Sequence, residues 1–250
     1  MKADLRNTSF LILVRLDSIE RLENTLIVAN TLAKKINTNI YVLEAGEYCN
    51  FILKRMLNKT IKYKFIEDND PVLHKTMYYN LMISEVMTSY VAIWDTDTVV
   101  DEKIIVKVVN NLQQGKADFA YPYNGIFMDT GSILRKLYIK TNNIRYLYKH
   151  VGKMKPLYDR IMVGGAVFFR REKFIEIGMD NEEQYGWSND DFDRFYRARN
   201  FGLSMYNTDN VLFHLSHPRN ANSQYRSLLQ KQHSIERLEN TEFLSKSEIK

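Results

Sequence analysis

Short apolar runs that alternate with helical segments are the strongest constraint on how this chain can fold. The runs 10–14 (FLILV), 40–43 (IYVL) and 90–94 (YVAIW) have no helical period, and they predict buried strands. A helix capped by Ser18, and another that runs from Pro71 to about residue 89, separate them. Strands that alternate with helices predict an α/β fold with a mostly parallel, doubly wound sheet, in which ligands bind beyond the carboxyl ends of the strands.

The second half of the chain is less regular. The alternating residues 61–66 predict a strand nearer an edge of the sheet, and residues 131–149 predict a basic, Tyr-rich helical stretch. Gly164 and Gly165 lead into a strand, and a short helix from Arg171 ends at Gly178. Short strands are expected at 203–206 and 211–215, and a charged helical segment from about residue 223.

Two carboxylates, Asp95 and Asp97, directly follow the predicted strand 90–94. Alternate residues of an extended chain point the same way, so both could face one point at the carboxyl edge of the sheet. Hard oxygen ligands there suit Mg²⁺ or Mn²⁺ that bridges a diphosphate. A solvated turn is the competing interpretation, because acidic residues are common in turns.

A second acidic cluster occupies residues 186–193 (GWSNDDFD). Acids at the start of a helix are explained by capping and by the helix dipole, and Asp193 could also pair with Arg197. The same segment suits a sugar site, because the indole of Trp187 can stack on a sugar ring and a carboxylate can accept a hydroxyl proton. The spacing alone leaves both interpretations open.

Two histidines, His214 and His217, follow the short predicted strand 211–215. A single histidine usually has a structural role, but two at this spacing can supply one or two imidazole ligands. Together with aspartate oxygens they suit Mn²⁺ better than Ca²⁺. The one cysteine, Cys49, is far from these residues in the sequence, which argues against a structural zinc site.

Charged residues also stand where the ligand crevice should begin. Arg15 and Asp17 follow the first strand, and Lys75 lies on the first turn of the helix after Pro71. Arg15 and Lys75 could contact a diphosphate or a base, or could be solvated surface charges. The chain has no Gly-rich Rossmann fingerprint and no P-loop, which argues against dinucleotide enzymes and P-loop NTPases.

Taken in order, these motifs resemble the β-1,4-galactosyltransferase family and its bacterial relatives among polysaccharide glycosyltransferases, over roughly residues 10–220. The resemblance implies a GT-A-type fold with a smaller C-terminal acceptor-side region. It rests on segments 13–17 (LVRLD), 73–80 (LHKTMYYN), 95–97 (DTD), 164–165 (GG), 186–193 (GWSNDDFD) and 214–217 (HLSH).

The same resemblance implies roles for individual residues. Asp191 matches the catalytic base, and Asp190 stands in the place of an acceptor-binding glutamate. Asp97 and His217, with His214 as a further candidate, match the metal ligands. Donor contacts fall on Arg15, Asp17, Lys75, Asp95 and Trp187, and acceptor contacts on Asp190, Gly165 and Trp187.

The function that follows is inverting transfer of a galactose-, N-acetylgalactosamine- or glucose-type hexose from a UDP-sugar, with Mn²⁺ or Mg²⁺. The acceptor would be a carbohydrate or lipid-linked glycan, as in bacterial surface polysaccharide or glycolipid synthesis. Residues 1–120 would bind the donor, 121–222 would bind the acceptor and carry the catalytic residues, and 223–250 would form a helical tail. A sugar-1-phosphate nucleotidyltransferase and a non-catalytic nucleotide- or carbohydrate-binding module remain alternatives.

Charge and terminal sequence bear on partners and location. The net charge of +5 is compatible with a diphosphate ligand or an anionic membrane surface, but basic and acidic residues are too interleaved to indicate nucleic acid. The polar N-terminus does not resemble a signal peptide, and no apolar run is long enough to span a bilayer. We therefore expect a cytoplasmic protein, with peripheral contact at the inner face of a membrane as an open possibility. The octapeptide SIERLENT occurs twice, at 18–25 and 234–241, and both copies suit an amphipathic helix.

Overall fold

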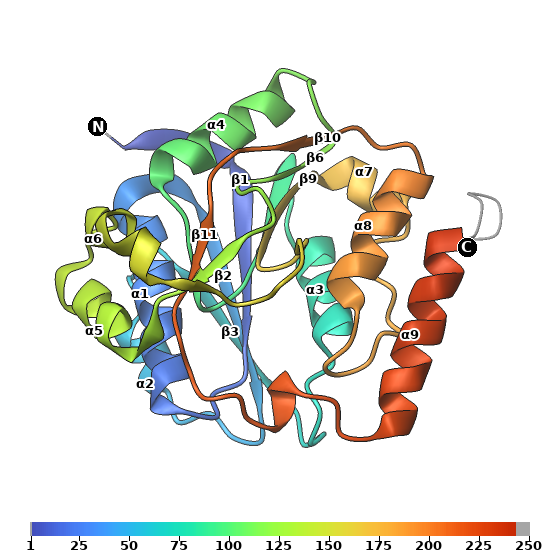
Figure 1. The fold of residues 1–250 in the computed structure, drawn as a ribbon, viewed down its shortest axis with the longest axis horizontal. Helices are drawn as coiled ribbons and strands as arrows, with labels where there is room; N and C mark the ends of the chain where they lie inside the picture. The colour runs from blue at the N-terminus through green and yellow to red at the C-terminus, as the bar shows by residue number, and fades with distance from the viewer. Residues whose placement is uncertain (1, 244–250) are drawn as a thin grey trace.

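A seven-stranded sheet runs through the centre of the computed structural model, which describes residues 2–243 (Figure 1). Its strand order is β10-β6-β9-β4-β1-β2-β3. Only β9 runs antiparallel to its neighbours, which confirms the predicted, mostly parallel sheet. The strands are β1 (Ala3–Val14), β2 (Ile36–Gly46), β3 (Lys62–Glu67), β4 (Tyr90–Trp94), β6 (Phe119–Tyr121), β9 (Ala166–Arg170) and β10 (Met205–Asn207).

The order of the strands explains their sequences. β1 lies between β2 and β4, and its residues Phe10, Leu11 and Ile12 are completely buried, as expected for an apolar run covered on both faces. β3 is at the edge of the sheet, and exposed and half-buried residues alternate from Lys62 to Phe65, which confirms the edge strand predicted from residues 61–66.

Two helices connect the parallel strands in opposite directions along the sheet. α1 (Ile19–Lys35) joins β1 to β2, and α3 (Lys75–Glu85) joins β3 to β4. Because such crossovers are right-handed, α1 and α3 lie on opposite faces, as Figure 1 shows. The predicted cap of α1 is present, since the Ser18 hydroxyl accepts a hydrogen bond from the Arg21 amide at 3.2 Å.

Helix α3 begins later than the sequence suggests. Pro71 was expected to open it, but the Val72 amide donates to Asp70 Oδ1 at 2.8 Å and the Leu73 amide donates to Asn222 Oδ1 at 3.2 Å. These bonds hold the segment after Pro71 as a loop, so that Lys75 becomes the first residue of the helix. The helix also ends at Glu85 rather than near residue 89.

Helix α4 (Glu102–Gln113) was not predicted. Its buried residues are mostly β-branched, which conceals a helical period, although Ile105, Val108 and Leu112 recur at helical spacing. Its N-cap is Asp101, whose side chain accepts from the Lys103 amide at 2.9 Å. The other short helices beside the main sheet are α2 (Ile52–Met56) and α7 (Arg171–Glu176).

A second, four-stranded sheet forms the smaller part of the molecule. Its order is β5-β11-β7-β8, and its strands are β5 (Thr98–Val99), β7 (Phe127–Asp129), β8 (Lys155–Pro156) and β11 (Leu212–His214). The helical stretch predicted for 131–149 is split by Asn142, which has a φ of 46°. Its pieces are α5 (Gly131–Thr141), α6 (Arg145–His150) and the 3₁₀ turn η1 (Val151–Lys153).

The last two helices pack against each other. α8 (Asp190–Asn200) follows the acidic cluster, and α9 (Leu228–Phe243) begins later than the predicted residue 223, after the 3₁₀ turn η2 (Ala221–Ser223). The two copies of SIERLENT lie in different contexts, because Ser18 caps α1 whereas Ser234 lies inside α9. Across residues 2–243, none of the helices combines the length and apolar character that a bilayer span requires.

Candidate active site

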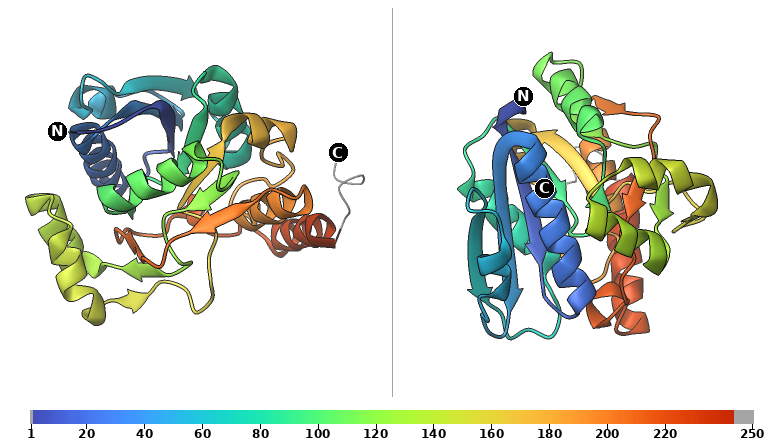
Figure 2. Two further views of the ribbon diagram at one scale, coloured as in Figure 1. Left: turned by 90° about the horizontal axis from the view of Figure 1, so that it is seen from above. Right: turned by 90° about the vertical axis from the view of Figure 1, so that its left-hand side faces the viewer.

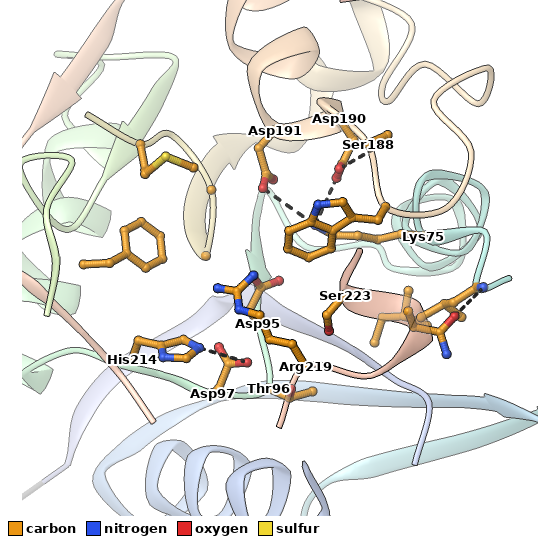
Figure 3. A pocket seen from close by; sticks show the side chains of 18 of the residues that line it. Lys75, Asp95, Thr96, Asp97, Ser188, Asp190, Asp191, His214, Arg219 and Ser223 are labelled. Carbon is orange, nitrogen blue, oxygen red and sulfur yellow. Dashed lines mark hydrogen bonds and ion pairs between the residues drawn. The ribbon is translucent and has the colours of Figure 1, made fainter. Parts of the chain in front are cut away.

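One pocket of about 310 Å³ opens at the carboxyl ends of β1 and β4. Segments far apart in the sequence line it, as Figure 3 shows for the side chains on its walls. Most residues that the sequence analysis singled out are among them, namely Arg15, Lys75, Asp95, Asp97, Gly165, Trp187, Asp190, Asp191, His214 and His217.

A candidate metal centre forms one wall. Asp97 Oδ2 lies 3.0 Å from His217 Nε2 and 3.9 Å from His214 Nε2. One ligand atom from each of the three residues lies within 4.8 Å of the other two. This mixture of carboxylate and imidazole donors fits Mn²⁺ by its chemistry.

A carboxylate behind His214 sets the orientation of its ring. His214 Nδ1 lies 2.8 Å from Asp129 Oδ1, and the Ser216 hydroxyl donates to both oxygens of Asp129 at 2.7 Å. An imidazole held at Nδ1 presents Nε2 to the pocket, toward Asp97. Asp129 comes from β7, far away in the sequence, and was not predicted.

The backbone that carries the two carboxylates is a turn. The Thr98 amide donates to the Asp95 carbonyl at 3.3 Å, and the Leu215 amide donates to the Asp97 carbonyl at 2.8 Å. The extended conformation expected for residues 95–97 is therefore wrong, although both side chains line the same pocket. Asp97 faces the histidines, whereas the pKa of Asp95 is affected by the charges of Lys75 and Asp191.

Burial and neighbouring charge separate the pKa values of these two carboxyls. Burial raises the pKa of Asp95 to about 6, although the ammonium of Lys75 opposes the shift. Burial acts in the same direction on Asp97, but the imidazoles of His214 and His217 outweigh it and hold its pKa below the usual range. Of the two carboxylates, Asp97 is the candidate metal ligand because it is the one that faces both histidines.

The opposite wall carries Asp191, which two cationic groups contact. Arg194 Nη1 donates to Asp191 Oδ1 at 2.7 Å. Lys75 Nζ lies 3.7 Å from Asp191 Oδ2, and Figure 3 shows these two residues. Burial alone would raise the pKa of Asp191, but Lys75 and Arg194 lower it below its ordinary value. The carboxylate is therefore ionised at neutral pH.

Asp190 has a different environment from its neighbour. Its Oδ2 lies 3.0 Å from Lys75 Nζ, and its side chain is 6 % exposed against 23 % for Asp191. Burial raises the pKa of Asp190 in spite of Lys75. Of the two carboxylates, Asp191 is the more accessible to a ligand in the pocket.

A buried ion pair fixes the arginine that holds Asp191. Arg194 is 1 % exposed, and its Nε and Nη2 donate to the two oxygens of Asp180 at 2.6 and 2.9 Å. Such a bidentate pair leaves Nη1 in one orientation, toward Asp191. Neither Asp180 nor Arg194 was predicted, because the acidic helix start alone does not reveal them.

The glycine pair is required by the close approach of its neighbours. A Cβ on Gly164 would lie 2.2 Å from Asp191 Oδ2, and one on Gly165 would lie 2.7 Å from the ring of Phe127. Gly165 also has a φ of +74°, which favours glycine. The pair therefore lets the wall that carries Asp191 pack directly against the start of β9.

Aromatic and cationic groups also line the pocket. The guanidinium carbon of Arg219 lies 5.6 Å from the ring centroid of Trp187 and 5.7 Å from that of Tyr158. Arg219 Nη2 also donates to the Tyr158 hydroxyl at 3.2 Å. Arg219, which is labelled in Figure 3, thus contacts two rings, and the sequence analysis missed it.

Of the two charged residues selected after β1, Arg15 lines the pocket and Asp17 does not. Arg15 lines the pocket and pairs with Asp68, and its Nη1 donates to the Asp70 carbonyl at 2.7 Å. Asp17 lies outside the pocket lining and instead accepts from Arg21 Nε at 2.9 Å. Arg21, which the sequence analysis did not select, lines the pocket in its place. A donor contact by Asp17 stays a prediction.

Helix α9 holds the loop that carries Trp187. Gln230 Nε2 donates to the Tyr185 carbonyl at 3.0 Å, and the Ser234 hydroxyl accepts from the Asn189 amide at 2.9 Å. Gly186 has a φ of +71°, and a Cβ there would lie 2.7 Å from Gln230 Nε2. The loop is therefore packed between α9 and the segment before α3.

The main sheet, with one antiparallel strand among parallel ones and carboxylates directly after β4, has the fold of GT-A-type glycosyltransferases. The catalytic domain of Drosophila β1,4-galactosyltransferase 7, solved with xylobiose, superposes with a TM-score of 0.54 at 17 % identity, over 94 % of this chain and 80 % of that one. A Pyrobaculum calidifontis mannosyltransferase, solved with GDP-Man and Mn²⁺, gives a TM-score of 0.56 at 11 % identity, over 86 % and 58 %.

A mycobacterial protein of known structure is similar to the same degree, with a TM-score of 0.52 at 12 % identity over 86 % of this chain and 69 % of that one. No protein-family model and no curated protein sequence matches this chain. At these identities the likeness establishes the fold.

Proposed function

We propose that the protein is an inverting glycosyltransferase that moves a hexose from a UDP-sugar to a carbohydrate hydroxyl with the help of a divalent cation. The observation that carries the proposal is that Asp97, His214 and His217 line the same pocket as the ionised Asp191. Similar folds occur in a galactosyltransferase solved with a disaccharide and in a mannosyltransferase solved with a nucleotide-sugar and Mn²⁺.

The donor would lie along the carboxyl ends of β1 and β4. Arg15, Lys75 and Asp95 line that side of the pocket and offer two cations and a carboxylate to a nucleoside diphosphate. Asp97, His214 and His217 would hold Mn²⁺ or Mg²⁺. When bound, the cation offsets the charge that develops on the diphosphate leaving group.

Asp191 is the proposed general base. The acceptor oxygen forms a bond to the anomeric carbon as the bond from that carbon to the diphosphate oxygen breaks, and the hydroxyl proton passes to the Asp191 carboxylate. Lys75 and Arg194 keep this carboxylate ionised, and Arg194 fixes its orientation. Asp190 and Gly165 are proposed to border the acceptor.

Trp187 is proposed to cover the sugar and to exclude water. Transfer rather than hydrolysis requires this exclusion, and the indole of Trp187 lies at the pocket beside Arg219. We propose that the transferred hexose is of the galactose, N-acetylgalactosamine or glucose type. The acceptor would be a polysaccharide or a lipid-linked glycan, and the enzyme would act in the bacterial cytoplasm.

Replacement of the proposed base gives the direct test. Asp191→Asn should lower acceptor-dependent release of UDP by about 10²- to 10⁴-fold, because general-base catalysis contributes about that much. Metal-dependent binding of UDP, measured by calorimetry, should stay close to that of the wild type. Asp209→Asn, which changes an exposed acid elsewhere, should leave both quantities unchanged. Turnover retained by Asp191→Asn would reject the base assignment.

A further inference from the structure

The positive charge of the chain is concentrated in one segment. Residues 131–160 contain eight Lys or Arg residues and one acid, Asp159, whereas the other 220 residues contain 27 basic and 29 acidic ones. This segment alone is therefore responsible for the basic character of the protein. We call it the basic lobe, and it comprises α5, α6, η1, β8 and the residues up to Arg160.

The basic lobe lies at the edge of the molecule. Figure 2 shows α5 and α6, coloured yellow-green, away from the strands of the N-terminal half. Arg135 is the one buried basic residue, and it pairs with Glu23 of α1 at 2.7 Å. The other seven are exposed, and none of them makes an ion pair within the part of the chain described: Lys136, Lys140, Arg145, Lys149, Lys153, Lys155 and Arg160.

Apolar side chains are exposed among these charges. On the outer face of α5, Ile133 is 81 % exposed at helical spacing from Lys136 and Lys140. On α6, the half-exposed ring of Tyr146 lies between Arg145 and Lys149 in sequence. Helices that present basic residues together with isolated apolar and aromatic ones suit the interface of an anionic bilayer, where the amines meet headgroups and the apolar groups enter the acyl boundary.

We propose that the basic lobe is a docking surface for anionic phospholipid headgroups. The lobe continues into the candidate active site, because Tyr158 and Arg160 belong to both the lobe and the pocket lining. A molecule docked through the lobe therefore has one wall of the pocket close to the membrane, where a lipid-linked acceptor would be presented. The docking rests on surface charge and exposure alone, so it is independent of the proposed transfer reaction.

The test is co-sedimentation of the full chain with vesicles. Vesicles of phosphatidylcholine with about one third phosphatidylglycerol should retain the protein, pure phosphatidylcholine vesicles should not, and added salt should release it. The triple variant Lys136→Glu, Lys140→Glu, Lys149→Glu should bind the anionic vesicles no better than the wild type binds the neutral ones. Ile133→Ser keeps every charge and should still weaken vesicle binding several-fold.

A matched control and a competing polyanion make the result decisive. The control is a second triple variant, Lys103→Glu, Lys107→Glu, Lys116→Glu, which changes three exposed lysines in and just after α4. It should bind vesicles like the wild type. Equal losses in both triple variants would overturn the proposal, as would absence of binding to anionic vesicles. Binding to an oligonucleotide through the lobe lysines, unaffected by Ile133→Ser, would instead assign the surface to nucleic acid. Thermal melts check folding, and UDP release with a soluble acceptor reports separately on the transfer reaction.

Discussion

At the scale of single residues, the pocket depends on side chains that hold other side chains. Asp129 and Ser216 orient His214, and Asp180 orients Arg194, which in turn contacts Asp191. None of these supporting groups needs to touch a substrate. Their effect should therefore appear as a change in the affinity or reactivity of the group that they hold.

Asp129→Asn tests the support of His214. The amide keeps a hydrogen-bond acceptor but loses the charge that favours Nδ1–H, so Mn²⁺ affinity measured by calorimetry should fall about 10- to 100-fold. Ser216→Ala, which removes one partner of Asp129 and leaves its charge, should cause a smaller loss. Unchanged metal affinity in Asp129→Asn would contradict a role of Asp129 in supporting His214 as a ligand.

Glu44 gives a prediction about pH and stability. It is 3 % exposed in β2 and accepts from the Tyr63 hydroxyl at 2.7 Å, and burial raises its pKa above the ordinary value of 4.5 in spite of that bond. Because the folded-state pKa is the higher one, folding favours the protonated form. Wild-type stability is therefore lost as pH rises from about 4.5 through the folded-state pKa.

Glu44→Gln removes this ionisation and keeps an acceptor for Tyr63. The variant should melt at a higher temperature than the wild type at pH 7, and the difference should shrink toward pH 4. Melting curves across this range measure it. A difference that does not vary with pH would contradict a raised pKa for Glu44.

Residues at strand ends could be predicted from the sequence, whereas residues that reach the site from distant parts of the chain could not. Asp95 and Asp97 were predicted because they follow the apolar strand 90–94. Asp129 and Arg219 were not, because His214 and Asp129 are brought together only by the parallel pairing of β11 with β7, and Arg219 only by its contacts with Tyr158 and Trp187. Local patterns contain no information on such pairings.

At the scale of elements, α9 supports the loop that enters the pocket. Inside this helix, Ser234 is buried, donates to Gln184 Oε1 at 2.9 Å and accepts from the Asn189 amide next to Asp190. Thr241 of the same helix donates to Asp193 Oδ2 at 2.8 Å. The tail helix thus fixes the start of α8, where Asp191 lies.

The repeated octapeptide supplies a matched pair of variants. Ser234→Ala would leave the Asn189 amide without this acceptor, so it should destabilise the protein by about 1–3 kcal/mol and lower kcat by loosening the start of α8. Ser18→Ala removes an N-cap, so it should lower the free energy of unfolding by about 1 kcal/mol while kcat stays unchanged. Chemical denaturation and steady-state kinetics separate the two effects. Equal losses of kcat in both variants would contradict a positioning role for α9.

Element types were easier to predict than their ends. The strands 10–14 and 90–94 were found because apolar runs covered on both faces are unambiguous, but β1 extends back to Ala3 through polar residues that pair with β2. The predicted start of α3 was wrong because Asn222, which is distant in the sequence, accepts a hydrogen bond from the Leu73 amide. Tertiary contacts of this kind decide helix ends and cannot be read from local sequence.

At the scale of the whole molecule, segments that are distant in the sequence meet in one pocket. The turn between β4 and β5 provides Asp95 and Asp97, β11 and the residues after it provide the histidines, and α8 provides Asp191. The fold was predictable from the alternation of strands and helices. In the small sheet β5-β11-β7-β8 only β11 was expected, as the strand 211–215, and the other three strands were missed because each has only two or three residues. The division at residues 120 and 222 stays a prediction.

The most direct measurement is thermal stabilisation of the wild type and Asp97→Ala by nucleotide-sugars with and without Mn²⁺. A ligand at about 100 times its dissociation constant stabilises the native state by about 2.7 kcal/mol, which corresponds to a shift of several degrees. We expect UDP-sugars to raise the melting temperature of the wild type only with Mn²⁺, and to leave Asp97→Ala unchanged. An equal rise without the metal, or in Asp97→Ala, would contradict a metal-dependent nucleotide-sugar site at Asp97.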